Sequence, residues 1–211
     1  MLISSPPFKS YITHILQWEG GLSNDPNDTA VHCAPFPGAY HTNKGVTYCT
    51  FLANADTLGL VKDYYTFIRL KDDDIGRFAY LFYLKSQGNR IPDPTSLALT
   101  EAAWGSGQER AVIHLQRALN HLGQNLIEDG VIGPKTIAAA NVVNPEQLYS
   151  AYWAERKAFI KYLGSLPKYS KWINGWENRI ASFLEKFPMG PAMGGIFILA
   201  IGLFLAIHKD L

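Results

Sequence analysis

Glu19 is the residue whose type and position first suggest chemistry. It follows Phe8 by 11 residues and lies on the same helical face as the apolar side chains between them, because about 11 residues make three helical turns. These apolar side chains are Phe8, Tyr11, Ile12, Ile15 and Leu16. A carboxyl group at the end of such a stripe faces the protein body, where desolvation and the helix C-terminal dipole disfavour its charged form. A carboxylic acid that stays protonated can act as a general acid, and the alternative is a helix-end glutamate that bends into solvent.

A second group of reactive side chains lies between residues 32 and 49. His32, Cys33, His41 and Cys49 contain zinc-binding atoms, but their spacing matches no established zinc motif. We therefore expect no metal and no cofactor. Cys33 and Cys49 either form a disulfide or remain thiols, because sequence spacing does not fix the distance between them.

The elements that must position these residues are predicted to be mainly helical. The apolar stripe predicts a first helix that ends near Glu19, where Gly20 and Gly21 supply a helix stop. Residues 22–49 are rich in Asn, Asp, Pro and Gly, which predicts a long loop with room for a short hairpin. Further helices are predicted over residues 50–54, 58–70, 73–85, 95–104, 108–122, 134–141, 145–163 and 169–187.

The C-terminal segment differs from the rest of the chain. Residues 188–207 contain no charged, hydroxyl or amide side chain. A helix from Pro191 to Lys209 would be about 28 Å long, close to the thickness of a bilayer's hydrocarbon core. We therefore predict one C-terminal transmembrane helix that contacts the lipid bilayer through residues 188–208. The alternatives are a buried core helix or an amphipathic tail.

Composition excludes some classes of protein. The formal net charge is +1, from 19 Lys and Arg against 18 Asp and Glu, so binding to nucleic acid through bulk charge is not expected. Two cysteines are too few for a disulfide scaffold.

Several motifs, in the same order, resemble glycoside hydrolase family 108, a family of N-acetylmuramidases. The strings EGG (19–21), NDPND (24–28) and NKGVT (43–47) are similar to the start of that family. The string LALTEAAWGSG (97–107) resembles its central helix. ERAVIHLQRAL (109–119) and DGVIGPKT (129–136) resemble its peptidoglycan-binding-type C-terminal region, and RKAF (156–159) and GWENR (175–179) fit its closing helices. The resemblance covers about residues 8–185.

The resemblance implies catalytic roles for three residues. Glu19 would protonate the glycosidic oxygen that leaves N-acetylmuramic acid. By analogy with similar phage lysozymes, a second group would stabilise the cationic sugar or activate water, and Thr47 would position a water molecule. Asp25 is the first candidate for this second group, and Asp28 is the alternative. Asp25 also suits a structural role in a turn, because Asp-Pro and Asn-Asp strings favour loops.

Three further residues are candidates for substrate binding. Asp28 belongs to the same loop as Asp25. Glu101 and Trp104 follow Leu97 on one helical stripe, where the carboxylate could hydrogen-bond the loop and the indole could stack on a sugar ring. The alternative for Glu101 is a buried glutamate or one that satisfies a helix cap, and the alternative for Trp104 is packing in the core.

The sequence also departs from the family pattern in the loop. Leu22 replaces an aromatic residue after EGG, Lys44 replaces a tyrosine, and an insertion replaces the glycine pair expected after Asp28. These departures leave Glu19 in place but change the residues available for contacts with substrate.

Together these observations predict a mainly α, lysozyme-like fold with a long active-site loop and one C-terminal transmembrane helix. Residues 1–107 would form the muramidase catalytic region, 108–187 a peptidoglycan-binding-type helical region packed on it, and 188–211 the membrane anchor. The expected activity is hydrolysis of the β-1,4 bond between N-acetylmuramic acid and N-acetylglucosamine in peptidoglycan strands. The expected setting is a phage endolysin or a cell-wall remodelling enzyme, anchored in the membrane, with its catalytic domain on the periplasmic or cell-wall side.

Two other functions remain open. A lytic transglycosylase would also use Glu19 but would close a 1,6-anhydro ring instead of adding water. A non-catalytic cell-wall-binding assembly protein would explain the loop departures through loss of the site.

Overall fold

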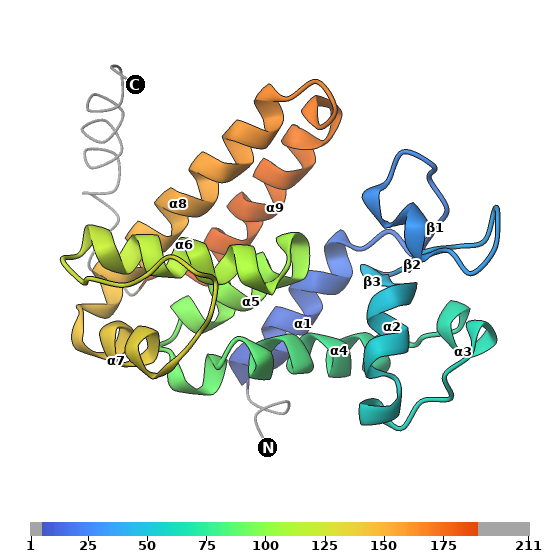
Figure 1. Ribbon diagram of the computed structural model, residues 1–211, viewed down its shortest axis with the longest axis horizontal. Helices are drawn as coiled ribbons and strands as arrows, with labels where there is room; N and C mark the ends of the chain where they lie inside the picture. The colour runs from blue at the N-terminus through green and yellow to red at the C-terminus, as the bar shows by residue number, and fades with distance from the viewer. Residues whose placement is uncertain (1–5, 190–211) are drawn as a thin grey trace. The chain divides into compact units, whose positions relative to one another are not determined.

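Residues 6–189 are described by a computed structural model, and most of them lie in helices (Figure 1). The chain divides into two compact units. One comprises Met1–Asn89 and Leu99–Ala111, and the other comprises Arg90–Ala98 and Val112–Leu211. The mainly helical fold predicted from periodicity is confirmed.

The first unit contains four whole helices and parts of two others. The whole helices are α1 (Pro6–Trp18), α2 (Tyr48–Asn54), α3 (Tyr64–Ile68) and α4 (Asp72–Lys85). Helices α5 (Thr95–Ser106) and α6 (Gln108–His121) each contribute residues to both units. Short 3-10 helices lie at η2 (Thr29–Cys33), η3 (Asp56–Leu58) and η4 (Gly88–Arg90).

The core of the first unit forms where α1 packs on α4. Phe8 and Tyr11 of the predicted apolar stripe are buried, and the ring of Phe8 lies 5.5 Å from Tyr80 and 5.4 Å from Tyr83, both on α4. Gly76 lets the two helices approach closely, since a methyl group there would lie 3.2 Å from Cδ1 of Ile12. This packing fixes the direction in which the C-terminal end of α1 presents Glu19.

The predicted loop at 22–49 carries a small antiparallel sheet. Its strands are β1 (Leu22–Ser23), β2 (Thr42–Asn43) and β3 (Val46–Thr47), in the order β1-β2-β3. Lys44 and Gly45 join β2 to β3 with φ angles of 46° and 80°. Two positive φ angles in a two-residue connection are typical of a type I′ turn, which suits the twist of the strands.

The helix predicted over residues 58–70 is shorter than expected. Gly59, with a φ of 65°, ends η3, and α3 begins only after Asp63, whose carboxylate accepts a hydrogen bond from the Thr66 amide at 2.7 Å. The start of α3 is therefore set by the capping side chain of Asp63, whereas the apolar pattern alone suggested an earlier start.

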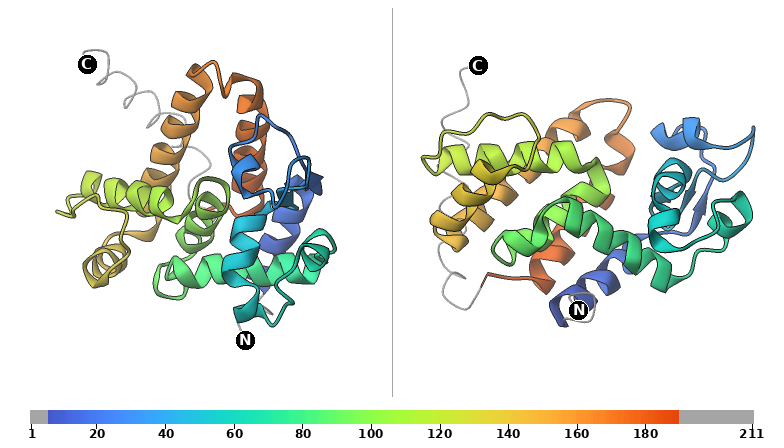
Figure 2. Two further views of the ribbon diagram at one scale, coloured as in Figure 1. Left: turned by 45° about the vertical axis from the view of Figure 1, so that its right-hand side comes forward. Right: turned by 60° about the horizontal axis from the view of Figure 1, so that its bottom comes forward.

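The second unit is built around a helical hairpin. It contains α7 (Pro134–Val142), α8 (Pro145–Ser165), η5 (Ser170–Trp172) and α9 (Ile173–Lys186). Figure 2 shows α8 and α9 side by side and antiparallel. At the base of the hairpin, the Trp153 ring packs 5.2 Å from the Phe183 ring, and the Tyr149 hydroxyl donates to the Phe187 carbonyl at 2.6 Å.

The DGVIGP segment has a structural role in this unit. Asp129 accepts hydrogen bonds from the Gln116 amide at 2.8 Å and from the Val131 backbone at 2.9 Å, and these bonds lower the pKa of Asp129. The Gly130 amide donates back to the side-chain oxygen of Gln116 at 2.9 Å. The turn is thereby fixed to α6 ahead of α7.

The predicted transmembrane helix and bilayer contact require correction. Among residues 6–189, no helix is both long and apolar enough to cross a membrane. The 21-residue α8 is long enough, but it carries Glu155, Arg156 and Lys157 near its middle, which a bilayer core disfavours. Residues 190–211 of the predicted anchor lie outside the described part of the chain. The expected membrane-anchored location is therefore unsupported.

Candidate active site

Glu19 follows directly after the last residue of α1, and its side chain is half-buried. The indole Nε1–H of Trp104 donates a hydrogen bond to its Oε1 at 2.8 Å. Trp104 lies on α5 and is itself held by Phe82 of α4, whose ring meets the indole edge to face at 5.3 Å. The structure therefore joins two of the predicted site residues, which are 85 positions apart in the sequence.

Gly45 closes the β2–β3 turn onto this pair. A methyl group at Gly45 would lie 2.6 Å from both Cδ and Oε2 of Glu19 and 2.7 Å from Nε1 of Trp104. Its φ of 80° also disfavours any residue with a side chain. The contact was not predicted from the sequence, although the string NKG is a hairpin-turn signal.

Lys44 holds the turn in place from the other side. Its backbone amide donates to the Gly21 carbonyl at 2.8 Å, and its ammonium forms an ion pair with Asp72 at the start of α4. The ion pair is solvent-exposed and contributes little stability by itself. Lys44 thus replaces the tyrosine of the family pattern with a polar link to a neighbouring helix.

Thr47 lies two residues after Gly45, at the end of β3. Its hydroxyl accepts a hydrogen bond from the Thr50 amide at 3.1 Å, which caps α2, and donates to the Thr50 hydroxyl at 2.9 Å. A hydroxyl oxygen can accept two hydrogen bonds, so one acceptor position remains for a water molecule.

Asp25 and Asp28 both stabilise turns in the loop that follows β1. Oδ1 of Asp25 accepts from the Asn27 backbone amide at 2.9 Å and from its side-chain amide at 3.1 Å. Oδ1 of Asp28 accepts from the Ala30 amide at 2.9 Å and caps η2. Both aspartates are half-buried. His41 links this loop to β2 through contacts of its ring nitrogens with the Asp25 carbonyl and the Thr42 hydroxyl.

Glu101 lies on α5, three residues before Trp104, and is only 5 % exposed. This burial favours a hydrogen-bonding role inside the first unit over direct contact with a polymer. The half-buried Trp104 contacts Glu19 through its N–H, whereas the sequence suggested that its ring either stacks on a sugar or packs in the core.

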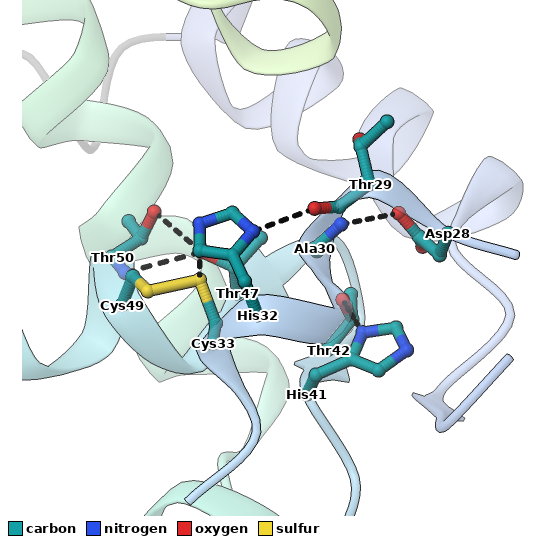
Figure 3. The surroundings of a disulfide bond; sticks show 10 residues. All are labelled: Asp28, Thr29, Ala30, His32, Cys33, His41, Thr42, Thr47, Cys49 and Thr50. Carbon is teal, nitrogen blue, oxygen red and sulfur yellow. Dashed lines mark hydrogen bonds between the residues drawn. A yellow bond between two sulfur atoms is a disulfide. The ribbon is translucent and has the colours of Figure 1, made fainter. Parts of the chain in front are cut away.

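A disulfide between Cys33 and Cys49 ties η2 to α2, with a Cα–Cα distance of 5.2 Å (Figure 3). The structure thereby resolves the question of pairing. His32 lies beside the bond, and its Nε2 is 3.6 Å from Sγ of Cys33. His32, Cys33 and Cys49 form a compact cluster, but sulfur atoms in a disulfide do not supply the thiolates that zinc prefers.

Comparison with known families places this site in context. The model of glycosyl hydrolase 108 matches residues 12–107, and that of a predicted peptidoglycan domain matches residues 110–181. Residues 12–107 are therefore similar to glycosyl hydrolase 108. The solved structure of SagA from Brucella abortus is similar, with a TM-score of 0.64 and 25 % sequence identity over 89 % of this chain and 98 % of that one. No curated protein sequence matches the chain.

The two family matches together indicate a glycoside hydrolase that acts on peptidoglycan. The segment that matches this family contains Glu19, the β1–β3 sheet and Trp104, so the geometry described above lies entirely within it. The α8–α9 hairpin falls largely in the segment that matches the peptidoglycan domain.

Proposed function

We propose that the chain is an N-acetylmuramidase that hydrolyses the β-1,4 bond between N-acetylmuramic acid and N-acetylglucosamine. The observation that carries the proposal is the hydrogen bond from Trp104 to Glu19, with the Gly45 turn closed over the carboxyl group. A carboxyl group fixed between an aromatic side chain and a glycine backbone is well placed to act as a general acid. We assign the catalytic region to residues 1–107 and the peptidoglycan-binding region to residues 108–187.

The proposed reaction begins with proton transfer from Glu19 to the glycosidic oxygen. Since the Trp104 N–H donates to Oε1, the proton that is transferred resides on Oε2. As the bond to the leaving sugar breaks, the muramic acid ring gains positive charge and Glu19 becomes a carboxylate. The indole N–H then stabilises that carboxylate, because hydrogen bonds to charged acceptors are stronger than those to neutral ones.

The second half of the reaction requires water. In this proposal Asp25 stabilises the cationic sugar, and Thr47 accepts a hydrogen bond from the water that attacks it. The proton that this water loses restores the acid form of Glu19. The hydrogen bonds of Asp25 to Asn27 hold its carboxylate in one orientation, and Thr47 keeps one acceptor position available. Asp28 and Glu101 would support substrate binding indirectly, Asp28 by capping η2 in the loop and Glu101 by hydrogen bonding inside the first unit. In a cell, such an enzyme would serve as an endolysin or as a cell-wall remodelling enzyme.

Analysis of reaction products tests the proposal. The full chain is incubated with purified peptidoglycan, and the released fragments are identified by mass. Glu109→Gln is the matched control for Glu19→Gln, because Glu109 is an exposed glutamate of the same unit.

We expect reducing N-acetylmuramic acid ends from the unaltered chain and from Glu109→Gln, and no release by Glu19→Gln. Anhydro-muramic ends would show a lytic transglycosylase instead. Release of peptides alone, or no release by the unaltered chain, would contradict the proposal.

A further inference from the structure

The turn between α8 and α9 differs in charge from the rest of the chain. Residues 156–176 contain no aspartate or glutamate, whereas the whole chain is nearly neutral. The basic residues in this segment are Arg156, Lys157, Lys161, Lys168 and Lys171. Of these, Lys157, Lys161, Lys168 and Lys171 are exposed. The turn therefore carries a local excess of positive charge in the second unit.

Three aromatic side chains gather at the same turn. The ring of Tyr169 lies 6.2 Å from the rings of both Trp172 and Trp176, and the two indoles are nearly parallel at 6.3 Å. Nζ of Lys171 lies 4.1 Å from the centre of the Trp172 ring, and Nζ of Lys168 lies 5.3 Å from that of Tyr169. We call Lys168, Tyr169, Lys171, Trp172 and Trp176 the hairpin-tip surface.

The aromatic residues of the hairpin-tip surface are not explained by core packing. At the base of the same hairpin, Tyr149 and Trp153 are each 1 % exposed. At the tip, Tyr169, Trp172 and Trp176 are only half-buried. Figures 1 and 2 show the turn at the end of the hairpin away from α7, in the same unit. Partly exposed aromatic rings of this kind are enriched where proteins bind ligands.

The backbone at the tip is held in one conformation. The Tyr169 amide donates to the Leu166 carbonyl at 2.9 Å, and the Trp172 amide donates to the Tyr169 carbonyl at 3.0 Å. Gly164 near the end of α8 packs directly on Ile173, since a methyl group there would lie 2.7 Å from that side chain. A rigid surface loses little conformational freedom when it binds a partner.

We propose that the hairpin-tip surface of the second unit binds peptidoglycan strands. Sugar rings present apolar C–H faces that stack on aromatic side chains, and the lactyl and peptide carboxylates of peptidoglycan complement the lysines in charge. The proposal rests on the proposed function for the identity of the polymer. It assigns to residues 166–176 the contact that retains the enzyme on its substrate between cleavage events.

Binding to whole sacculi tests this surface apart from catalysis. The full chain carrying Glu19→Gln is mixed with purified sacculi, and the fraction that sediments is measured against sacculus concentration. Two test variants are made in that background, Lys168→Glu with Lys171→Glu and Trp172→Ala with Trp176→Ala. The matched control is Lys135→Glu with Lys186→Glu, which makes the same change of charge at exposed lysines elsewhere in the unit.

We expect each test variant to bind about tenfold more weakly and the control to bind as the Glu19→Gln parent does. Added salt should reduce binding of the parent more than that of the Lys168→Glu, Lys171→Glu variant. Circular dichroism checks that all variants remain folded.

Two results would overturn the proposal. Parent-like sedimentation of the charge-reversed variant is one. The other is parent-like sedimentation of the Trp172→Ala, Trp176→Ala variant, which would show that the aromatic rings take no part in binding. Neither result depends on which bond the enzyme cleaves. Failure of the binding proposal can therefore be distinguished from failure of the proposed function.

Discussion

At the scale of single residues, the candidate site depends on the hydrogen bond that the indole N–H of Trp104 donates to Glu19. Sequence reasoning singled out both Trp104 and Glu19, the first as a sugar-stacking residue and the second as an acid. It could not pair them, because no local rule relates two residues 85 positions apart. Glu19 could be found because helical periodicity places it at the end of a stripe whose other members are largely buried.

Trp104→Phe should lower the rate of peptidoglycan cleavage about 10- to 100-fold. It keeps an aromatic ring against Phe82 but removes a hydrogen bond to a carboxylate, which contributes about 1.5–3 kcal/mol. The rate is followed as the loss of turbidity of a sacculus suspension across a range of pH. If Trp104→Phe weakens substrate affinity but leaves the maximal rate and the pH profile unchanged, Trp104 acts in sugar stacking instead.

Gly45→Ala should reduce activity by more than about 100-fold, because the new methyl group would displace the Glu19 carboxyl group. Gly59→Ala is the control. Gly59 has a φ of 65°, and a methyl group there would meet no atom within 4 Å, so the control carries similar backbone strain without the clash. Cleavage rates and thermal unfolding are measured for both. Equal activity of the two variants would argue against a functional contact between Gly45 and Glu19.

At the scale of elements, the long helices were predictable and the active-site loop was not. Helices such as α4 and α8 lie close to their predicted ranges because each carries an apolar stripe or a clear N-terminal signal. The strands of the loop have two residues each, which is too short for an alternating pattern to appear. The pairing of Cys33 with Cys49 depends on distance and could not be read from spacing.

Removing the disulfide should destabilise the first unit by about 3 kcal/mol, since the bond closes a loop with a sequence separation of 16 residues. The Cys33→Ser, Cys49→Ser variant should also cleave peptidoglycan more slowly, because η2 and α2 flank Asp28 and Thr47. Chemical denaturation and cleavage rates are measured with and without a thiol reductant. The reductant should lower the stability and the cleavage rate of the unaltered chain but not those of the double variant. Equal stability of the two chains under oxidising conditions would contradict the prediction.

The base of the α8–α9 hairpin should make stability sensitive to alkaline pH. Burial raises the pKa of Tyr149 from 10.0 to about 12. Folding therefore favours the neutral phenol. Its contribution to the free energy of unfolding is fully present below pH 10 and is lost as the pH rises toward 12. The expected loss is about 2–3 kcal/mol in the free energy of unfolding.

Denaturant unfolding between pH 9 and 12 measures this loss. Tyr149→Phe should be less stable at pH 9, because the hydrogen bond to the Phe187 carbonyl is gone, yet its stability should fall less between pH 10 and 12. Parallel curves for the two chains would show that Tyr149 is not the group responsible.

At the scale of the whole molecule, two segments that match different families share one chain. The glycosyl hydrolase 108 match ends at residue 107 and the peptidoglycan domain match begins at residue 110. The near-neutral total charge conceals the basic segment at 156–176, which composition alone could not reveal. The predicted membrane anchor rested on the uncharged run at residues 188–207 and on the length of helix it would form, and no helix among residues 6–189 is long and apolar enough to cross a membrane.

The central claim is that Glu19 is the acid that cleaves the glycan strand. The most direct measurement is the initial rate at which the full chain releases reducing ends from purified peptidoglycan, compared between the unaltered chain and Glu19→Gln. We predict a loss of at least about 1,000-fold in Glu19→Gln, with an unchanged unfolding transition and unchanged sedimentation with sacculi. A Glu19→Gln chain that released reducing ends as fast as the unaltered chain would contradict the account.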